Sequence, residues 1–386
     1  MLNIKGGGKK MSRVYLDNAS TTKIRPESLE AMNAAYSEYG NPSSLHHEGQ
    51  SSRKTLEDAR ESIAVSLHCD PTEVYFTSGG TESDNWAVSF AGFPDREKKH
   101  IITSPIEHPA VLNACKRMEK EGFRITYLPV DKYGSVSADD LEKVITDDTA
   151  LVSVMMVNNE IGTIEPIIRL SEIAHAHGAL FHTDAVQAVG SLPVDFSDLQ
   201  ADLLSFSSHK FYGPYGTGGL LIRNRVKIPS FVVGGAQEYG HRAGTENLPG
   251  IIGMAKALQL GISEMDSNLG HILDLRQELC RSLQKECPQV LFHGDSEVSH
   301  PGIVNFYVPG VNGEKMLLLL DYAGFAISGG AACSSKDHEV SHVLKAIGAS
   351  EKEAGNSLRV SIGTYNTEQD IRSFVSAFCD ILKKNF

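Results

Sequence analysis

The chain has 386 residues, 41% hydrophobic and 22% charged, which is ordinary for a globular protein and long enough for two domains. Its formal net charge of −12 argues against the basic surface that nucleic-acid binding requires. No apolar run approaches the roughly 20 residues of a membrane span, and residues 1–10 lack the apolar core of a signal peptide.

Helical and strand patterns alternate from about residue 57 to residue 224. Helices are predicted at residues 57–67, from 82 onward, at 110–120, at 138–145 after a Ser137 cap, and at 166–177. Strands are predicted at residues 73–77, 100–103, 124–128 and 151–157, and in the two apolar runs that lead to Asp184 and Lys210. This alternation predicts an α/β domain around a mostly parallel sheet.

The second part of the chain begins with an almost continuous helical pattern at residues 247–287, long enough to bridge two domains. Strand patterns at residues 303–307 and 358–361 and helical patterns at 315–322 and 368–384 follow it. These elements predict a smaller α/β domain.

The six cysteines are scattered and form no Cys-x-x-Cys pair: Cys69, Cys115, Cys280, Cys287, Cys333 and Cys379. In a chain of this length the spacing indicates neither a disulfide framework nor a zinc site. We therefore expect a reducing, cytoplasmic compartment. Five of the cysteines are interpreted as ordinary thiols, whereas Cys333 lies in an unusual segment.

A glycine-rich turn at residues 77–82 follows a predicted strand and begins a predicted helix. Its glycines allow close approach of the backbone to a ligand, and a helix N-terminus favours a phosphate. On this segment alone, an ordinary turn with a threonine cap remains open.

Two charged side chains end the neighbouring apolar runs. Asp184, followed by Gln187, ends one run, and Lys210 follows Ser207 and His209 at the end of the other. Pyridoxal phosphate (PLP) needs a lysine for a Schiff base and a carboxylate at its ring nitrogen, while the Gln187 amide could bond the ring hydroxyl. The alternatives are an aspartate that caps the next helix and a solvated lysine on a turn.

The chain resembles the cysteine desulfurases of the NifS/IscS type, in the class V branch of the fold-type I PLP enzymes. The segments that carry the resemblance are residues 15–22, 40–44, 76–83, 107–109, 158–162, 182–187, 207–216, 242–247 and 359–363. They occur in the same order as in that family and run nearly from end to end of the chain.

The resemblance implies the fold and the domain boundaries. A large domain with a mostly parallel, seven-stranded type of sheet would comprise residues 20–262. Residues 1–19 and 263–386 would form the smaller α/β domain, which would carry a mobile loop with Cys333.

The resemblance also implies a role for each site residue. Lys210 would be the Schiff-base lysine, and His108 would stack on the cofactor ring and help move protons. The phosphate would be held by Gly80, Thr81, Ser207 and His209, and by Thr245 of the neighbouring subunit in a homodimer. Asn159, beside the cofactor, and Arg359 would bind the substrate carboxylate, for which the planar guanidinium fork of arginine is suited.

Cys333 lies in a segment of small residues, 328–336, with two glycines and few apolar anchors. We expect such a segment to be mobile and its thiol to be accessible, although a free cysteine is more often buried and inert. In the resembled family, a cysteine here attacks the sulfur of L-cysteine and carries it away as a persulfide, while alanine is released.

The function implied is thus that of a cysteine desulfurase, which would pass sulfur to an acceptor such as an iron–sulfur scaffold protein. Three alternatives remain open. They are a PLP lyase acting on selenocysteine or cysteine sulfinate, for which Cys333 is dispensable, a transaminase that needs a keto acid, and a non-catalytic scaffold. His338 and His342 are spaced like metal ligands but lack acidic or thiol partners, so surface histidines are the preferred interpretation and no metal is expected.

Overall fold

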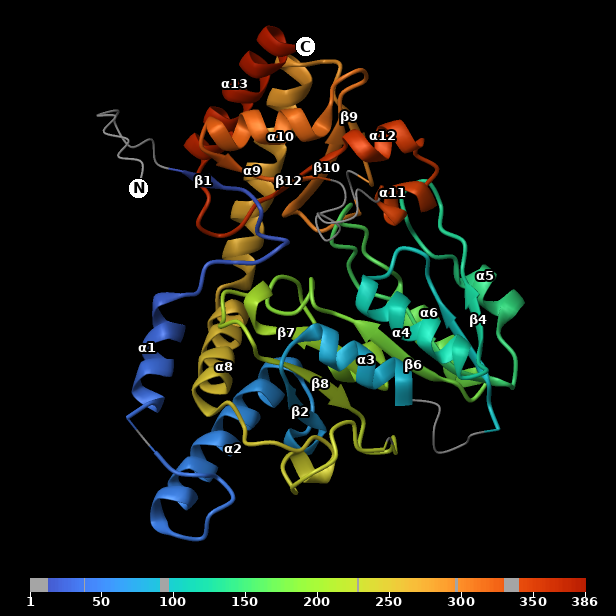
Figure 1. Cartoon of the computed structure of the whole chain (residues 1–386), viewed down its shortest axis with the longest axis vertical. Helices are drawn as coiled ribbons and strands as arrows, with labels where there is room; N and C mark the ends of the chain where they lie inside the picture. Colours follow the sequence, from blue (N-terminus) through green and yellow to red (C-terminus); the bar gives the residue numbers. More distant parts are fainter. Residues whose placement is uncertain (1–12, 38, 91–96, 228, 296–297, 330–339) are drawn as a thin grey trace, which may run out of the picture.

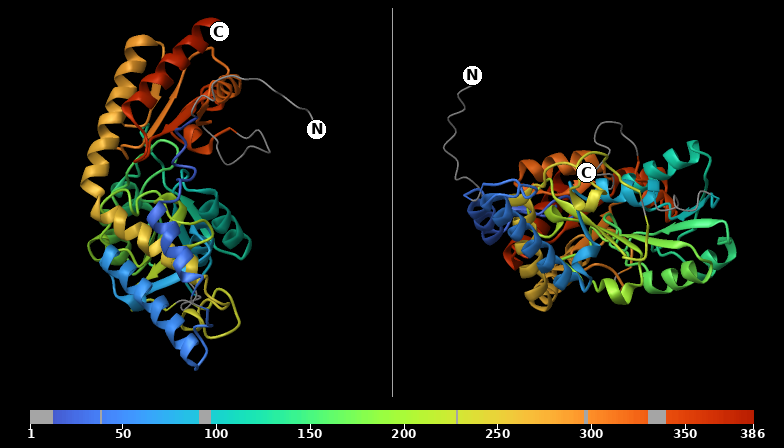
Figure 2. Two further views of the ribbon diagram at one scale, coloured as in Figure 1. Left: turned by 90° about the vertical axis from the view of Figure 1, so that its left-hand side faces the viewer. Right: turned by 90° about the horizontal axis from the view of Figure 1, so that it is seen from below.

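The computed structural model describes residues 13–37, 39–90, 97–227, 229–295, 298–329 and 340–386. A larger part is built around a seven-stranded sheet, and a smaller part is built around a four-stranded sheet (Figure 1). A long helix, α9 (Met265–Glu286), runs from one part to the other along one side of the molecule (Figure 2).

The large sheet has the strand order β2-β8-β7-β6-β5-β3-β4. Its strands are β2 (Val74–Thr77), β8 (Gly218–Ile222), β7 (Leu203–Ser207), β6 (Leu180–Asp184), β5 (Thr149–Ser153), β3 (His100–Thr103) and β4 (Arg124–Tyr127). The pairings from β7 to β4 are parallel, whereas β8 is antiparallel to both of its neighbours. The predicted mostly parallel sheet is therefore confirmed.

Helices cover both faces of this sheet, which explains why its central strands read as continuous apolar runs. Leu203 packs with Trp86 of α3 (Gly80–Phe90) and Val111 of α4 (Pro109–Lys120) on one face. The adjacent Leu204 belongs to the core on the other face. That core is covered by α2 (His47–Leu67), α6 (Ile167–Ala176), α7 (Phe196–Leu199) and α8 (Leu248–Ser263), and α1 (Pro26–Ala35) packs on α8.

The predicted elements of this part differ from the structure mainly at their ends. The run at residues 151–157 leaves the strand after Ser153, although Val154 and Met156 still donate backbone hydrogen bonds along β6. Ser137 is the N-cap residue of α5 (Ala138–Val144), but its side chain makes no capping hydrogen bond.

The small sheet has the order β12-β13-β10-β9, and all of its pairings are antiparallel. The strands are β12 (Ser328–Gly329), β13 (Leu358–Ser361), β10 (Ile303–Tyr307) and β9 (Leu291–His293). The helices of this part are α10 (Gly313–Tyr322), α11 (His342–Ala346), α12 (Glu351–Asn356) and α13 (Glu368–Asn385). The N-terminal strand β1 (Val14–Tyr15) pairs with β11 (Phe325–Ala326), so the first described residues lie against the small part.

The long helical pattern at residues 247–287 forms two helices, because α8 ends at Ser263 and α9 begins at Met265. At the end of α9, Cys287 is joined by a disulfide to Cys379 of α13. The prediction of ordinary thiols is thus wrong for these two cysteines. Packing of α9 against α13 brings together residues 92 positions apart in the sequence, which the spacing alone did not reveal.

Candidate active site

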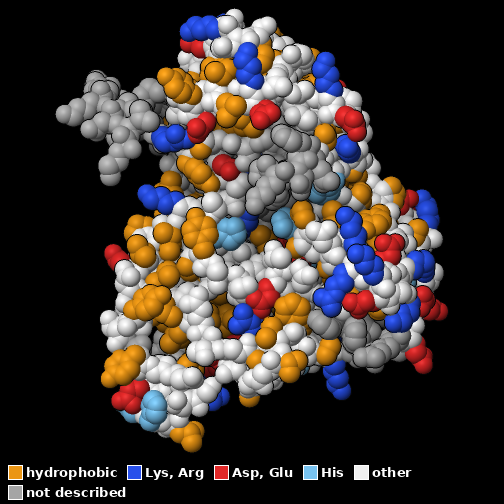
Figure 3. All heavy atoms as spheres, in the orientation of Figure 1, with side chains coloured by type: hydrophobic (Ala, Val, Ile, Leu, Met, Phe, Trp, Pro, Cys, Tyr) orange, Lys and Arg blue, Asp and Glu red, His pale blue; other side chains and the backbone are white. Residues whose placement is uncertain are grey.

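A cavity of about 310 Å³ lies where the carboxyl ends of the parallel strands meet the small part. Ligand sites in open α/β sheets typically occupy this edge. The residues that line it are Ala19, Ser20, Gly80, Thr81, Asp84, His108, Met155, Asn159, Asp184, Val186, Gln187, Ser207, His209, Lys210 and Arg359. On the face shown in Figure 3, histidine side chains gather at the junction between the two parts.

Lys210 enters the cavity from a 3₁₀ turn (Ser208–Lys210) that directly follows β7. Its Nζ donates hydrogen bonds to the carbonyl oxygens of Ala19 (2.6 Å) and Ser20 (2.9 Å). The N-terminal segment therefore lies next to the amine. Gln187, predicted to bond the ring hydroxyl of a cofactor, here donates from Nε2 to the same Ala19 oxygen at 2.8 Å.

Asp184 ends β6 and shares the cavity with a second acid, Asp84 of α3. Burial raises the pKa of both carboxyl groups, and the Asp184 charge raises the pKa of Asp84 further. At Asp184, the hydrogen bond from the Val186 N–H and the charge of the Lys210 ammonium lower the pKa and so oppose the effect of burial. We therefore infer that Asp84 holds the proton and that Asp184 carries the charge.

His108 is the N-cap residue of α4, and its Nδ1 accepts a hydrogen bond from the backbone N–H of Ala110 at 3.2 Å. Burial lowers the pKa of His108 to about 4, with a further contribution from Lys210. The imidazole is thus neutral at pH 7. Because Nδ1 accepts, the single proton of the ring is on Nε2.

The glycine-rich turn has the geometry of a cradle for an anion at the start of α3. Gly79 has a φ of 149°, which L-residues rarely adopt, and a Cβ on Gly80 would lie 2.6 Å from Val186 Cγ2. Ser207 and His209 face this helix terminus from the end of β7. The free N–H groups of the first helical turn then favour an anion.

An acidic residue in this first turn does not oppose anion binding, because it is already paired. Glu82 accepts hydrogen bonds from Arg242 Nε (2.8 Å) and Nη2 (3.2 Å) and from the Ser78 N–H (2.8 Å). These bonds lower the pKa of Glu82 despite its burial. The cradle is therefore close to neutral before a ligand binds.

Arg359 of β13 reaches the cavity from the small sheet, with only 2% of its side chain exposed. Its Nη1 donates to the carbonyl oxygen of Asn159 at 2.8 Å. Its Nη2 donates to Asp17 Oδ1 (2.8 Å) and Ser20 Oγ (2.7 Å). A permanent positive charge thus lies opposite the wall that carries Asp184.

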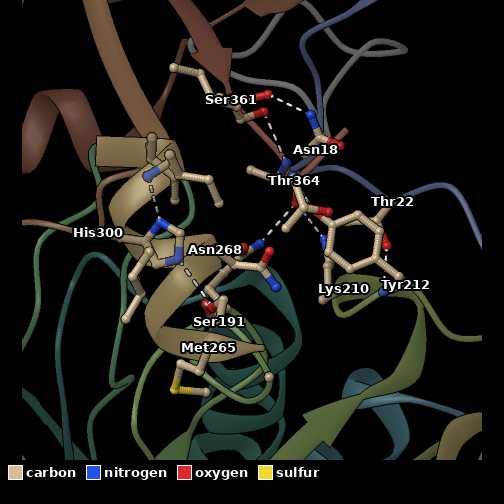
Figure 4. A pocket seen from close by; sticks show the side chains of 18 residues that line it. Asn18, Thr22, Ser191, Lys210, Tyr212, Met265, Asn268, His300, Ser361 and Thr364 are labelled. Carbon is tan, nitrogen blue, oxygen red and sulfur yellow. Dashed lines mark hydrogen bonds between the residues drawn. The ribbon is translucent and has the colours of Figure 1, made fainter. Parts of the chain in front are cut away.

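A second, smaller cavity of about 50 Å³ lies on the other side of Lys210, between the N-terminal segment and α9 (Figure 4). At its edge the Gly302 N–H donates to His300 Nδ1, so His300 Nε2 carries the proton that bonds Ser191 Oγ at 3.1 Å. This volume holds only a few water molecules.

The structure brings together in the larger cavity every predicted site residue except two. Thr245 is exposed and does not line the cavity of its own protomer, and Cys333 lies outside the described residues. Sequence reasoning missed Ala19, Ser20, Asp84, Met155 and Val186. Of these, Asp84 had a usable signal, because it lies four residues after Gly80 and so faces the same side of a helix.

The donor set fits PLP on three observations. A lysine amine, a buried carboxylate and an anion cradle at a helix N-terminus all face one cavity. The volume of the cavity is at the lower end of the ~300–1,000 Å³ typical of small-molecule sites. Asp184 is buried, as a carboxylate that pairs with a pyridinium nitrogen must be.

Metal binding and membrane insertion find no support in the described residues. Within the described ranges, no group of three or more His, Cys, Asp or Glu side chains could hold a metal ion. None of the helices in that part of the chain is both long and apolar enough to cross a membrane.

Comparison with known proteins gives matches over almost the whole chain. A family model described as Aminotransferase class-V matches residues 14–374. "Cysteine desulfurase IscS" of Dictyoglomus turgidum is 48% identical over 373 residues, covering 96% of this chain and 95% of that protein. The protein of the same name from Methanosarcina thermophila is 47% identical over 373 residues, covering 96% and 92%.

Solved structures agree with these sequence matches. A "NIFS-LIKE PROTEIN" superposes with a TM-score of 0.91 at 37% identity, covering 96% of this chain and 99% of that one. "SspA in complex with cysteine" superposes with a TM-score of 0.80 at 33% identity, covering 92% and 99%.

Proposed function

Because the chain belongs to the class-V aminotransferase family, and within it to the cysteine desulfurases of the IscS type, we propose that it removes sulfur from L-cysteine. The products are L-alanine and a persulfide on Cys333. The observation that carries the proposal is the single cavity into which Lys210, Asp184 and Arg359 all project. One relative in the solved structures was captured with cysteine, which supports the choice of substrate.

PLP is the cofactor of this family, and when bound it supplies an electron sink for the Cα of the substrate. Lys210 would hold the cofactor covalently and then accept the Cα proton of L-cysteine on Nζ. Asp184 would keep a positive charge on the ring nitrogen. His108, neutral with its proton on Nε2, would stack on the ring and help to move protons.

Arg359 and Asn159 would hold the carboxylate of L-cysteine, so that its sulfur stays free to react. The Cys333 thiolate then attacks this sulfur, so a new S–S bond forms as the Cβ–S bond breaks. The overall change is balanced, because L-cysteine and a thiol give L-alanine and a persulfide without any external oxidant or reductant.

The anion cradle would bind the cofactor phosphate through Gly80, Thr81, Ser207 and His209. We further propose a homodimer in which Thr245 of the partner subunit completes this set. The exposure of Thr245 supports this arrangement, since it has no role in the cavity of its own protomer.

We also propose that residues 20–262 form the large domain and that residues 1–19 and 263–386 form the small one. In support, Leu16 packs in the same hydrophobic core as residues of α9, β10 and α13. The core around the large sheet is separate from it.

A sulfur acceptor, such as an iron–sulfur scaffold protein, and a cytoplasmic location complete the proposal. The scattered cysteines support the location, whereas the Cys287–Cys379 disulfide weighs against a reducing compartment. The mass of the peptides containing these two cysteines, taken from cells quenched with an alkylating agent, would show their redox state.

The decisive experiment incubates the purified holoenzyme with L-cysteine and measures alanine, sulfide and the mass of the Cys333 peptide. We expect alanine and a mass increase of one sulfur atom, and we expect Cys333→Ala to abolish transfer to an acceptor. Cys69→Ala, which changes a free cysteine outside the cavity, is the matched control. Sulfur or selenium release by Cys333→Ala at the wild-type rate would instead indicate a lyase that needs no persulfide.

A further inference from the structure

The segment at residues 15–22 has no role in the proposed chemistry, although it runs directly along the cavity. Ala19 and Ser20 line the cavity, and Asp17 lies two residues before them. The Asp17 carboxylate contacts Arg359, the residue assigned to the substrate carboxylate. Any role of Asp17 in catalysis therefore depends on that assignment of Arg359, and so rests on the proposed function.

The contact leaves part of the Arg359 guanidinium free for a ligand. Three of its five N–H donors bond Asp17, Ser20 and the Asn159 carbonyl. Nε is buried, and among the described residues it has no hydrogen-bond partner. The bonds therefore fix the orientation of the group without using all of its donors.

Asp17 is itself held in place by hydrogen bonds to two hydroxyl groups. Its Oδ1 accepts from Ser20 Oγ (2.9 Å) and from Ser328 Oγ (2.8 Å). Ser328 of β12 is directly opposite Arg359 in the small sheet. One carboxylate oxygen thus receives hydrogen bonds from Arg359 and from its neighbour across the sheet.

The backbone around Asp17 is attached to the same strand as Arg359. Asn18 Nδ2 donates to the Ser361 carbonyl at 2.8 Å, as Figure 4 shows, and the Ala19 N–H donates to Ser361 Oγ at 2.9 Å. Ser361 lies two residues after Arg359 on β13. The distance between the Asp17 carboxylate and the guanidinium is therefore set by backbone attachment as well as by their mutual attraction.

A second buried arginine shows what a purely structural pair looks like in this protein. Arg60 donates to both oxygens of Glu238 and also to the Val74 carbonyl, and both side chains are 2% exposed. Neither residue lines the active-site cavity. Arg359, in contrast, meets Asp17 through one nitrogen and one oxygen and lines the cavity.

We propose that Asp17 is a positioning residue, which holds the Arg359 guanidinium in the orientation that receives the carboxylate of the amino-acid substrate. A free arginine side chain loses rotamer entropy when it is fixed in one orientation. Since Asp17 fixes the side chain before the substrate arrives, binding does not carry this cost. Asp17 does not itself line the cavity, so we expect it to act on binding through Arg359 rather than on the chemistry.

The test compares the steady-state kinetics of Asp17→Ala and Asp17→Asn with those of the wild-type holoenzyme. We expect Asp17→Ala to raise KM for L-cysteine about tenfold and to change kcat by less than about threefold. Asp17→Asn keeps an acceptor oxygen, so its KM for L-cysteine should stay close to that of the wild type. Asp140→Asn, an acid paired with Lys143 on α5, is the matched control and should behave as wild type.

A double-mutant cycle separates positioning from general stabilisation. Because Asp17 acts only through Arg359, Asp17→Ala should have no further effect on kcat/KM in an Arg359→Ala background. An unchanged KM in Asp17→Ala, or independent losses in the cycle, would overturn the proposal. If Asp17→Ala does not fold, the same cycle is run with Asp17→Ser, which also removes the carboxylate, and additive losses have the same meaning.

A binding measurement distinguishes this inference from the proposed function. The Kd of L-alanine, followed by the visible absorbance of the holoenzyme, depends on the carboxylate site and not on sulfur transfer. If the wild type binds L-alanine but forms none from L-cysteine, the proposed function fails. The Asp17 inference then stands if Asp17→Ala weakens L-alanine binding about tenfold, and falls if it does not.

Discussion

The two walls of the active-site cavity are built in different ways. The wall formed by the large sheet carries Asp184 and Lys210 at the carboxyl ends of adjacent parallel strands, with His108 beside them. The wall formed by the small sheet carries Arg359, which is held by residues from the far N-terminal part of the chain. The first wall is made from consecutive strand–helix units and the second from long-range contacts.

Their electrostatics differ as well. On the large-sheet wall, burial favours the neutral forms of ionisable groups. It lowers the pKa of His108 and raises the pKa of Asp84. On the small-sheet wall, the guanidinium of Arg359 is paired with the Asp17 carboxylate. We infer that the first wall controls proton transfer and that the second recognises a carboxylate.

Replacement of the amine on the large-sheet wall should have the largest effect. We expect Lys210→Ala to lower alanine formation from L-cysteine at least about 10³-fold, because both covalent attachment of the cofactor and acceptance of the Cα proton are lost. The measurement is single-turnover alanine release, with cofactor retention after dialysis as a second readout. Lys256→Ala, on α8 and outside the cavity, is the control, and a loss below tenfold would remove Lys210 from the chemistry.

The two acids on that wall should differ sharply from each other. Asp184→Asn removes a buried charge and should lower kcat about 10²-fold. Asp84→Asn should change kcat by less than about threefold, since burial and the Asp184 charge raise the pKa of Asp84 and favour its protonated form. Parallel kcat measurements at pH 8 test this contrast, and similar losses in both variants would show that the proton is not confined to Asp84.

On the small-sheet wall, replacement of Arg359 should affect the binding of L-cysteine. Arg359→Ala should lower kcat/KM for L-cysteine by about 30-fold, within the range for a lost hydrogen bond to a charged group of about 1.5–3 kcal/mol. Arg359→Lys should retain more of the wild-type kcat/KM than Arg359→Ala but not all of it, because an ammonium group does not reproduce the planar fork of the guanidinium. A fall in kcat without a rise in KM would contradict the division of roles between the two walls.

The smallest expected effect concerns the pH dependence of stability beneath the large-sheet wall. Burial raises the pKa of Glu107 to about 8, so the folded state binds a proton there that the unfolded state releases near its ordinary pKa. The bound proton on Glu107 therefore contributes to the stability of the folded state at low pH, and this contribution is lost as the pH rises through the pKa of about 8. Glu107→Gln lacks this titration and should therefore gain stability relative to wild type between pH 6 and pH 9.

Urea unfolding at pH 6 and pH 9 measures the difference in free energy of unfolding between Glu107→Gln and the wild type. Glu119→Gln, on the exposed face of α4, is the control and should follow the wild type at both values. A constant difference between Glu107→Gln and the wild type across this range would show that Glu107 does not titrate there.

The residues of the large-sheet wall could be predicted from the sequence because the patterns that indicate them span only a few residues. An apolar run followed by Asp184 or by Lys210 places each side chain at a strand end, and parallel strands bring such ends to one edge. Gly79 and Gly80 likewise mark a turn through the conformation and the close approach that they permit. In contrast, the helical spacing from Gly80 could have placed Asp84 near the cavity, but its protonated state depends on burial next to Asp184.

The sequence by itself thus determined the fold class, the cofactor type and most of the residues of one wall, since periodicity and strand-end motifs act over a few residues. Only the tertiary structure decided which acid holds the proton, that Cys287 meets Cys379, and that Asp17 orients Arg359. These properties depend on distance and desolvation between segments far apart in the chain. No local pattern records them, because they arise only when segments far apart in the sequence pack against each other.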